Sequence, residues 1–317
     1  MHSNRTRTLR TIAFLAAPLL TLSLAGCSKD KSAKTTTADT TAAAAAAAAD
    51  TAAVADTTAA ATPAALSAGC APDKLALVAA RKLTIATDKP VYPPWFIDDD
   101  PANGKGFEGA VAYAVAETLG FARDQVAWKV VPFNSSYSPG KKDFDFDINE
   151  ISITDERKVA VDFSDGYYSV NQAVVALNDT PISAVTSIAD LAKYKFGAQV
   201  GTTSLEFIKG TVKPTQETFV YDDTNAAKSA LAGKQIDAIV VDLPTAFFIT
   251  GSEIEGSKVV GQFPSAPGGE EFGLLFGKGS KLVPCVNEAI AALKSSGKLA
   301  AIQEAELATA TNAPLFK

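Results

Sequence analysis

A short run near the middle of the chain combines two hydroxyl side chains with an arginine. The run is Ile151-Ser-Ile-Thr-Asp-Glu-Arg157, in which Ser152 and Thr154 precede the arginine. A guanidinium presents a rigid planar fork that can meet a carboxylate through two parallel hydrogen bonds, and nearby hydroxyls can add further donors. A single run of this kind also fits an arginine that is simply exposed to solvent. The carboxylate-binding interpretation therefore depends on the motifs that accompany it.

A second group of hydroxyls follows a predicted strand. Gly201-Thr-Thr-Ser204 stands between the strand predicted over 195–200 and a helix predicted to begin at Thr203. Backbone N–H groups and hydroxyls at the N-terminus of a helix can bind an anion. Thr and Ser are also ordinary N-capping residues, which would leave them no binding role. Both interpretations remain open for Thr202 and Thr203.

An aspartate ends another predicted strand. Ile236-Asp-Ala-Ile-Val-Val-Asp242 is an apolar run that ends in a carboxylate, and Pro244 follows it closely. Open α/β sheets bind ligands outside the carboxyl ends of their strands, where an aspartate can pair with an ammonium group. Alternatively, Asp242 only caps the helix that Pro244 begins.

The elements that must position these residues alternate along the chain. Period-two and buried apolar runs predict strands over 82–87, 126–131, 144–148, 195–200, 236–241 and 272–276. Apolar stripes at helical spacing predict helices over 108–119, 203–209, 226–231, 286–293 and 298–307. This alternation predicts an α/β architecture with parallel sheets. The globular part begins near Cys70 and has about 250 residues, enough for one large domain or two modest ones.

The first residues have the pattern of an export signal. Three arginines precede an apolar core over 12–24, and Leu24-Ala-Gly-Cys27 matches a lipoprotein cleavage motif. We expect 1–26 to be the signal peptide and Cys27 to be acylated, although a plain secretory peptide or a short anchor helix would also fit. Residues 27–69 are rich in Ala and Thr, and we expect a disordered tether there. No later segment is long and apolar enough to span a bilayer.

Charge and rare residues exclude several classes of function. Removal of the signal would take away His2, the only histidine, and with it Ser/His or Cys/His catalysis and histidine metal sites. The net charge of −6 would become −6 − 3 = −9, because the signal carries three arginines and no acid, which argues against a nucleic-acid partner. The acidic run 143–147 lacks the Gly and Glu of a calcium loop, so we expect neither a metal nor a cofactor. Cys70 and Cys285 either pair in an oxidising exterior or stay as two free thiols.

Taken in order, the motifs resemble those of the family-3 extracellular solute-binding proteins, the amino-acid-binding components of bacterial ABC importers. The resemblance covers about 83–307. It implies an α/β, two-lobed periplasmic-binding-protein (Venus flytrap) fold of type II with mixed, mostly parallel sheets. Lobe one would comprise 70–171 plus 270–317, and lobe two 172–269. Cys70 and Cys285 would then both lie in lobe one, where a disulfide could join them.

The resemblance also implies the roles of residues that bind the main chain of an amino acid. Arg157 and Ser152 would bind the ligand α-carboxylate, together with Thr203, which matches the binding threonine of the family's Gly-Thr-Thr and follows Thr202. Asp242 ends a segment similar to the family's DAVVVD-x-P and would bind the α-ammonium.

Other residues would meet the ligand side chain. Asp88 and Tyr92 resemble the family's TD-x-x-YPPF opening with one extra residue between them, and Phe133 would form an aromatic wall or pack in the core. Glu150 departs from the small residue of many relatives, which favours a polar or cationic ligand unless its side chain turns to solvent. Gln199 falls where relatives vary with ligand class.

The implied function is capture of a polar, possibly cationic, L-amino acid by lobe closure, followed by delivery to an ABC permease. The protein would be a monomer anchored through Cys27 to the outer face of the cytoplasmic membrane. Two alternatives remain: a tethered sensor that presents the ligand to a receptor, and a dehydratase-like enzyme in which Glu150 is the acid.

Overall fold

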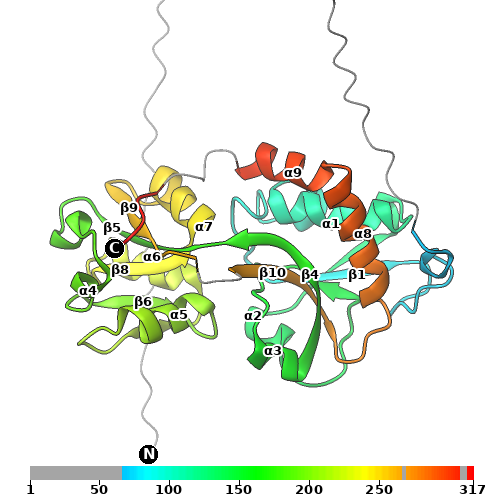
Figure 1. The fold of residues 1–317 in the computed structure, drawn as a ribbon, viewed down its shortest axis with the longest axis horizontal. Coiled ribbons are helices and arrows are strands. Elements are labelled where there is room, and N and C mark those ends of the chain that lie inside the picture. The colour runs from blue at the N-terminus through cyan, green and yellow to red at the C-terminus, as the bar shows by residue number, and fades with distance from the viewer. Residues whose placement is uncertain (1–65, 266–268, 308–312) are drawn as a thin grey trace, which may run out of the picture. The chain divides into compact units, whose positions relative to one another are not determined.

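The structure is a computed structural model that describes residues 66–265, 269–307 and 313–317 (Figure 1). The predicted signal peptide, Cys27 and nearly all of the predicted tether lie outside the described residues. Within the described ranges, none of the helices combines the length and apolar character that a membrane span requires. The described chain forms two lobes, each built around one five-stranded sheet.

The sheet of lobe one has the strand order β2-β1-β3-β10-β4. Its strands are β1 (Leu83–Thr87), β2 (Val126–Val130), β3 (Phe146–Asp147), β4 (Val161–Val170) and β10 (Glu270–Gly277). Strand β1 is parallel to β2 and β3, whereas β10 is antiparallel to β3 and β4. The helices of this lobe are α1 (Phe107–Thr118), α2 (Phe133–Ser136), α3 (Asp155–Ala160), α8 (Val283–Ser295) and α9 (Lys298–Leu307). Apolar side chains of α1 and α8 pack with β1 and β10 in the main core of the lobe.

The sheet of lobe two has the strand order β7-β6-β8-β5-β9. Its strands are β5 (Gln172–Leu177), β6 (Phe196–Gln199), β7 (Phe219–Tyr221), β8 (Ala238–Asp242) and β9 (Ser257–Gln262). Strand β6 is parallel to β7 and β8, whereas β5 is antiparallel to β8 and β9. The helices are α4 (Ile188–Leu191), α5 (Thr203–Phe207), α6 (Thr224–Ala232) and α7 (Leu243–Phe248). Alternate residues of β5 and β8 enter two separate cores, as expected for a sheet that is covered on both faces.

Short turns of 3₁₀ or π-helix complete the described elements. They are Ala68–Cys70, Pro101–Asn103, Arg123–Gln125, Pro181–Ala184, Ile208–Val212 and Ile249–Glu253. The chain passes from lobe one to lobe two where β4 ends at Val170 and β5 begins at Gln172 (Figure 1). The predicted α/β two-lobed architecture is confirmed, and so is the mixture of strand directions. Parallel pairs do not predominate, however, because β10 and β5 each bring two antiparallel pairings into their sheets.

The last described residues correct the predicted division of the chain. We expected all of 270–317 in lobe one, but 313–317 lies against lobe two. The backbone N–H of Gln262 donates to Pro314 O (2.8 Å), and that of Phe316 donates to Gln262 O (3.0 Å). Phe316 packs on Phe263, with ring centroids 5.3 Å apart. The physical reason is that β9 is an edge strand with unpaired backbone groups beside an apolar core, and this segment satisfies both.

A disulfide joins Cys70 to Cys285, with their Cα atoms 5.3 Å apart. Of the two possibilities that the sequence left open, the structure therefore has the paired one. Both cysteines belong to the main core of lobe one, so the bond ties the segment before β1 to α8.

Candidate functional site

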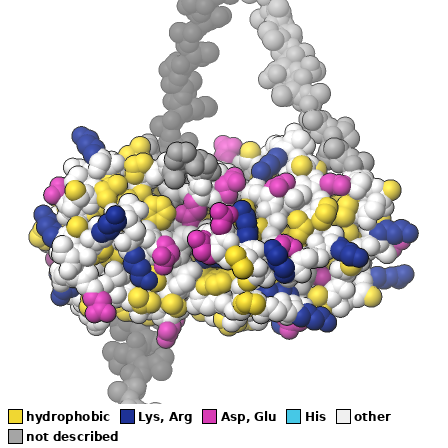
Figure 2. All heavy atoms as spheres, turned by 60° about the horizontal axis from the view of Figure 1, so that its bottom comes forward, with side chains coloured by type: hydrophobic (Ala, Val, Ile, Leu, Met, Phe, Trp, Pro, Cys, Tyr) yellow, Lys and Arg dark blue, Asp and Glu magenta, His cyan; other side chains and the backbone are white. Residues whose placement is uncertain are grey.

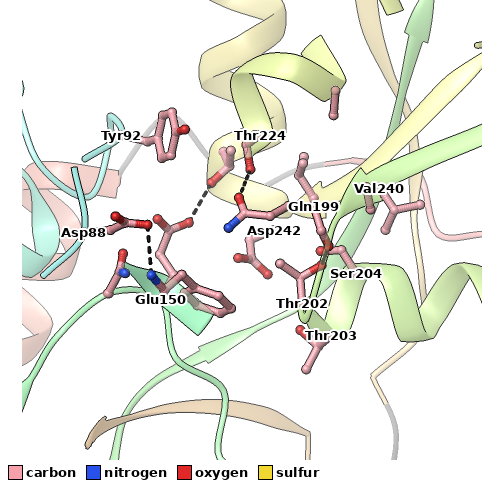
Figure 3. A pocket seen from close by; sticks show the side chains of 16 residues that line it. Asp88, Tyr92, Glu150, Gln199, Thr202, Thr203, Ser204, Thr224, Val240 and Asp242 are labelled. Atoms are coloured by element: carbon pink, nitrogen blue, oxygen red, sulfur yellow. Dashed lines mark hydrogen bonds between the residues drawn. The ribbon is translucent and has the colours of Figure 1, made fainter. Parts of the chain in front are cut away.

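A pocket lies where strands of both sheets end. From lobe one, Asp88 follows β1 and Glu150 follows β3, while Asp242 is the last residue of β8 in lobe two. The lining residues are Asp88, Tyr92, Phe133, Asn149, Glu150, Ala198, Gln199, Thr202, Thr203, Ser204, Thr224, Ala227, Val240, Val241, Asp242 and Thr245. Figure 3 shows Asp88, Tyr92 and Glu150 on one side, opposite Gln199, Thr202, Thr203 and Asp242. The pocket thus lies at the carboxyl ends of parallel strands, where α/β sheets bind ligands.

The structure brings most of the predicted ligand residues together. Eight of them line the pocket: Asp88, Tyr92, Phe133, Glu150, Gln199, Thr202, Thr203 and Asp242. Ser152 and Arg157 are not among the lining residues. Ser152 nevertheless lies close by, because its Oγ is 3.4 Å from Thr203 Oγ1. The binding role of each of these residues stays a prediction.

Arg157 is buried and binds backbone oxygens on both sides of the pocket. Its guanidinium donates to Ser152 O (2.7 Å) in lobe one and to Gly201 O (3.0 Å) in lobe two. The charge also lies over the ring of Tyr137, 4.9 Å from its centroid. The solvent-exposed alternative is therefore wrong, since only 8% of the residue is accessible. Its burial lowers the pKa of the guanidinium.

The hydroxyls of 201–204 divide between two tasks. Thr202 Oγ1 accepts from the backbone N–H of Leu205 (3.2 Å), so Thr202 is the N-cap of α5. Thr203 is the first helical residue, and its Oγ1 lies near Ser152 Oγ, as noted above, and near Gln172 Nε2 (3.5 Å). The capping interpretation is thus confirmed for Thr202, and the hydroxyl of Thr203 is left for the pocket.

Asp242 is held by a glutamine that the sequence analysis missed. Gln172 Nε2 donates to Asp242 Oδ1 (2.6 Å) and to Glu270 Oε2 (3.1 Å), while its Oε1 accepts from Ser204 Oγ (2.6 Å). The Asp242 side chain makes no capping hydrogen bond to α7, so the capping alternative is wrong. Gln172 opens the apolar strand β5 and is 1% exposed. A lone amide before a run of apolar residues was the only available signal.

Glu150 has its backbone held from lobe one and its carboxylate held from lobe two. It has a positive φ of 53°, a conformation that non-glycine residues rarely adopt. Its N–H donates to Glu108 Oε1 (2.7 Å), and the Tyr167 hydroxyl donates to the same oxygen. Its Oε2 accepts from Thr245 Oγ1 (3.3 Å). The predicted alternative of a solvent-facing glutamate is therefore wrong. No sequence motif pointed to Glu108 or Thr245, which lie far from Glu150 along the chain.

Asp88 turns toward the backbone at the start of α2. Its Oδ2 accepts from the N–H of Phe133 (3.1 Å), and its Oδ1 accepts from the N–H of Lys89 (2.7 Å). The bond to Phe133 fixes the aromatic ring that lines the pocket. On the other side, Thr224 Oγ1 donates to Gln199 Oε1 (2.9 Å), which orients the amide of Gln199. These bonds orient side chains on both walls of the pocket. They leave other polar atoms of the walls available to a ligand.

The electrostatics of the pocket are dominated by desolvated acids. Burial raises the pKa of Asp242 and of Glu150 well above their usual range, and neighbouring carboxylates raise them further. Burial also raises the pKa of Glu108 to about 7, although the Tyr167 hydroxyl and the Glu150 N–H lower it. In the part of the chain that is described, no lysine or arginine lines the pocket. Acidic side chains also gather near the middle of the face shown in Figure 2.

The sequence of this chain is similar to those of known bacterial binding proteins. A family model for bacterial extracellular solute-binding proteins, family 3, matches residues 83–307. The L-arginine-binding protein of Pseudomonas aeruginosa is 31% identical over 257 residues, covering 73% of this chain and 95% of that protein. The L-cystine-binding protein TcyJ of Escherichia coli K12 is 31% identical over 216 residues, 67% of this chain and 78% of that protein.

Solved structures agree with the family match. An ancestral arginine-binding protein bound to arginine is 30% identical and has a TM-score of 0.60, covering 71% of this chain and 97% of that one. The matched 71% of this chain is longer than either lobe, so the similarity extends over both lobes. The order of the motifs, the fold and these similarities agree, and the chain belongs to the bacterial extracellular solute-binding proteins of family 3.

Proposed function

We propose that this protein captures an amino acid outside the cytoplasm and delivers it to the permease of an ABC importer. The family, the names of its relatives and the polar pocket between the lobes support this proposal. The relatives are binding proteins, so we propose binding and not catalysis. Acylation of Cys27, which would hold the protein at the outer face of the membrane, is part of the same proposal.

The ligand is a cationic amino acid. The observation that carries this proposal is the charge of the pocket: Asp88, Glu150 and Asp242 line it, and none of the described lining residues is basic. Ionised carboxylates are strongly destabilised by burial unless a cation compensates them. An amino acid with an ammonium or guanidinium side chain supplies two positive charges, one at each end. A neutral amino acid supplies only its α-ammonium, and an acidic one adds repulsion.

The arrangement of the walls suggests how such a ligand lies. Asp242 binds the α-ammonium, and the α-carboxylate meets Thr203 and the remaining donors of Arg157. Ser152 joins them when its hydroxyl turns from Glu270 Oε1 (2.5 Å) to the ligand. The side-chain cation then points toward lobe one, where Glu150 and Asp88 accept its hydrogen bonds. Charge-assisted bonds of this kind are about twice as strong as neutral ones.

Binding favours closure because each lobe supplies part of the pocket. A ligand shifts the balance between open and closed forms only by its differential affinity for them. A cationic amino acid that contacts Asp242 in lobe two and Glu150 in lobe one makes both contacts only when the lobes are closed. The closed form is then the state that the permease recognises.

Glu150→Gln tests the proposed ligand class. The amide keeps the size and the acceptor oxygen of Glu150 but removes its charge, so affinity for arginine and lysine should fall by about 2–5 kcal/mol in isothermal calorimetry. Affinity for glutamine should change far less. Glu206→Gln, the same change at an exposed position of α5, is the matched control and should bind as the wild type does. Unaltered arginine affinity in Glu150→Gln would rule out the proposed cation site.

A further inference from the structure

Two consecutive hydrogen bonds cross from lobe one to lobe two and back through Thr245. Trp95 Nε1 in lobe one donates to Thr245 Oγ1 on α7 in lobe two (2.7 Å). Thr245 Oγ1 in turn donates to Glu150 Oε2 in lobe one (3.3 Å). Trp95 is fully buried and Thr245 is 6% exposed, so water competes little for the bond between them.

The chemistry of the donors and acceptors determines the direction of both hydrogen bonds. An indole N–H can only donate, so the Thr245 oxygen must accept from Trp95. The single hydroxyl proton of Thr245 is then free to point at Glu150, and a carboxylate is a better acceptor for it than a neutral carboxyl group. The bond between Thr245 and Glu150 is therefore strongest when Glu150 is ionised, which polarises the bond from Trp95 as well.

Trp95 and Glu150, the two ends of this hydrogen-bonded series, are each held in place by neighbouring residues. Trp95 packs edge-on against Tyr168 and Phe272, with ring centroids 5.5 and 5.4 Å apart. At the other end, the backbone of Glu150 is fixed by its bond to Glu108. Glu150 Oε1 makes no hydrogen bond with any described residue, and Glu150 lines the pocket, where a ligand cation would meet it. Among the described residues, Thr245 alone hydrogen-bonds both to the Glu150 carboxylate and to the Trp95 indole.

We propose that Thr245 is a positioning residue that couples cation recognition at Glu150 to closure of the lobes on Trp95. The proposal rests on the proposed function for the identity of the cation. A cation at Oε1 keeps Glu150 ionised, the ionised carboxylate draws the Thr245 proton, and the Trp95–Thr245 contact strengthens. A neutral ligand leaves this contact weaker. Thr245 therefore adds to the preference for cationic ligands without touching the cation.

Other titratable groups face Glu150 and must be distinguished from it. They are Glu108 on α1, Asp88 after β1, Asp242 at the end of β8, Tyr92 and Tyr167. Burial and the carboxylates among these groups raise the pKa of Glu150, whereas the Thr245 hydroxyl lowers it. Of the groups that shift the pKa of Glu150, only Thr245 also accepts the hydrogen bond of the Trp95 indole.

The indole resonance of Trp95 measures this coupling in the full chain. The sequence has two tryptophans, so ¹H–¹⁵N spectra contain two indole signals, which Trp128→Phe assigns. Trp128 Nε1 donates to Tyr113 and serves as the internal control. The closed fraction of the ligand-free protein has the Trp95–Thr245 contact, so its Trp95 signal should move with the ionisation of Glu150. Arginine raises the closed fraction, so it should enlarge this movement and shift its midpoint to lower pH. Thr245→Val, which has the same shape without the hydroxyl, should abolish this movement, and Thr245→Ser should retain it.

Calorimetry with the same variants supplies the second readout. Thr245→Val should weaken arginine binding by roughly tenfold to a hundredfold, the effect of a lost hydrogen bond to a charged group. The loss should be smaller for glutamine, because a neutral ligand closes the lobes on a weaker Trp95–Thr245 contact. Thr245→Ser should restore it. Equal losses for both ligands, or a Trp95 titration that is the same in Thr245→Val and wild type, would overturn the coupling. If the wild type binds no amino acid, the proposed function fails, but the ligand-free titration still decides the role of Thr245.

Discussion

At the scale of single residues, the carboxylates of the pocket are held by neutral donors. Asp242 accepts from the amide of Gln172, Glu150 from the hydroxyl of Thr245, and Asp88 from a backbone N–H. Neutral donors fix the direction of each carboxylate but supply no positive charge of their own. Such a site is preorganised for a cation, because the side chains do not have to leave a competing ion pair before they bind one.

Arg157 should contribute both to binding and to the local fold. Arg157→Ala removes the proposed partner of the ligand carboxylate, and affinity for the amino acid should fall by about 2–5 kcal/mol. It also removes the donors to Ser152 O and Gly201 O, so the ligand-free protein should melt at a lower temperature. Calorimetry and thermal melts separate the two effects. Full affinity in a folded Arg157→Ala protein would show that the guanidinium contributes only to the local fold.

Sequence motifs predicted those site residues that lie at the ends of strands. Asp242 could be found because it ends an apolar run, and Asp88 because it belongs to a segment that resembles the family's TD-x-x-YPPF opening. Gln172 and Glu108 could not, because each sits in an apolar element and its partners are distant in the sequence. The role of Glu150 was only half predictable: its acidic type stood out, but its left-handed backbone and its bond to Thr245 depend on the packing of the two lobes.

At the scale of elements, the apolar strand that ends at Asp242 was predicted, whereas both edge strands of its sheet were missed. The predicted strand over 236–241 corresponds to β8, which is buried on both faces. Strands β7 and β9 were not predicted, and both are edge strands whose pairing is decided by their neighbours. Segment 313–317 was assigned to the wrong lobe for the same reason. The position of this segment depends on the unpaired edge of β9, and nothing in the sequence of the segment indicates that edge.

Phe316 should stabilise lobe two. Phe316→Ala removes a ring that is 4% exposed and packs on Phe263, so the free energy of unfolding should fall by about 3–5 kcal/mol in urea denaturation. Leu315→Ala is the matched control, because Leu315 is 60% exposed, and it should change stability by less than about 0.5 kcal/mol. Equal effects of the two changes would contradict the docking of this segment on lobe two.

The disulfide should stabilise lobe one without affecting the pocket. Replacing both Cys70 and Cys285 by serine should lower the free energy of unfolding by about 2–4 kcal/mol, since the bond closes a loop that spans most of the globular chain. Neither cysteine lines the pocket, so arginine affinity of the folded protein should stay the same. Denaturation of the oxidised protein with and without a reductant measures the first effect. Unfolding that a reductant leaves unchanged would contradict it.

At the scale of the whole molecule, ligand-free stability should depend on the protonation of the buried acids. Their pKa values are raised in the folded state, so between the unfolded and folded pKa values the folded protein binds more protons than the unfolded chain. Stability is therefore fully present below the unfolded pKa values and is lost as pH rises through the folded ones. Acids with lowered pKa, such as Asp162 and Asp179, oppose this only at lower pH.

The ligand-free melting temperature should thus be higher at about pH 5 than at about pH 8. Arginine supplies the missing charge, so its stabilising effect should grow over the same interval. Thermal melts by circular dichroism, with and without saturating arginine, test both statements. A ligand-free melting temperature that rises across this interval would contradict the account of the buried acids.

The central claim is that the pocket takes a cationic amino acid, and calorimetric titration of the purified protein tests it most directly. Arginine, lysine, glutamine and glutamate would be titrated under the same conditions at neutral pH. The charge of the pocket predicts a single site that binds arginine or lysine more tightly than glutamine, with glutamate weakest. Tighter binding of glutamine or glutamate than of either cationic amino acid would contradict it.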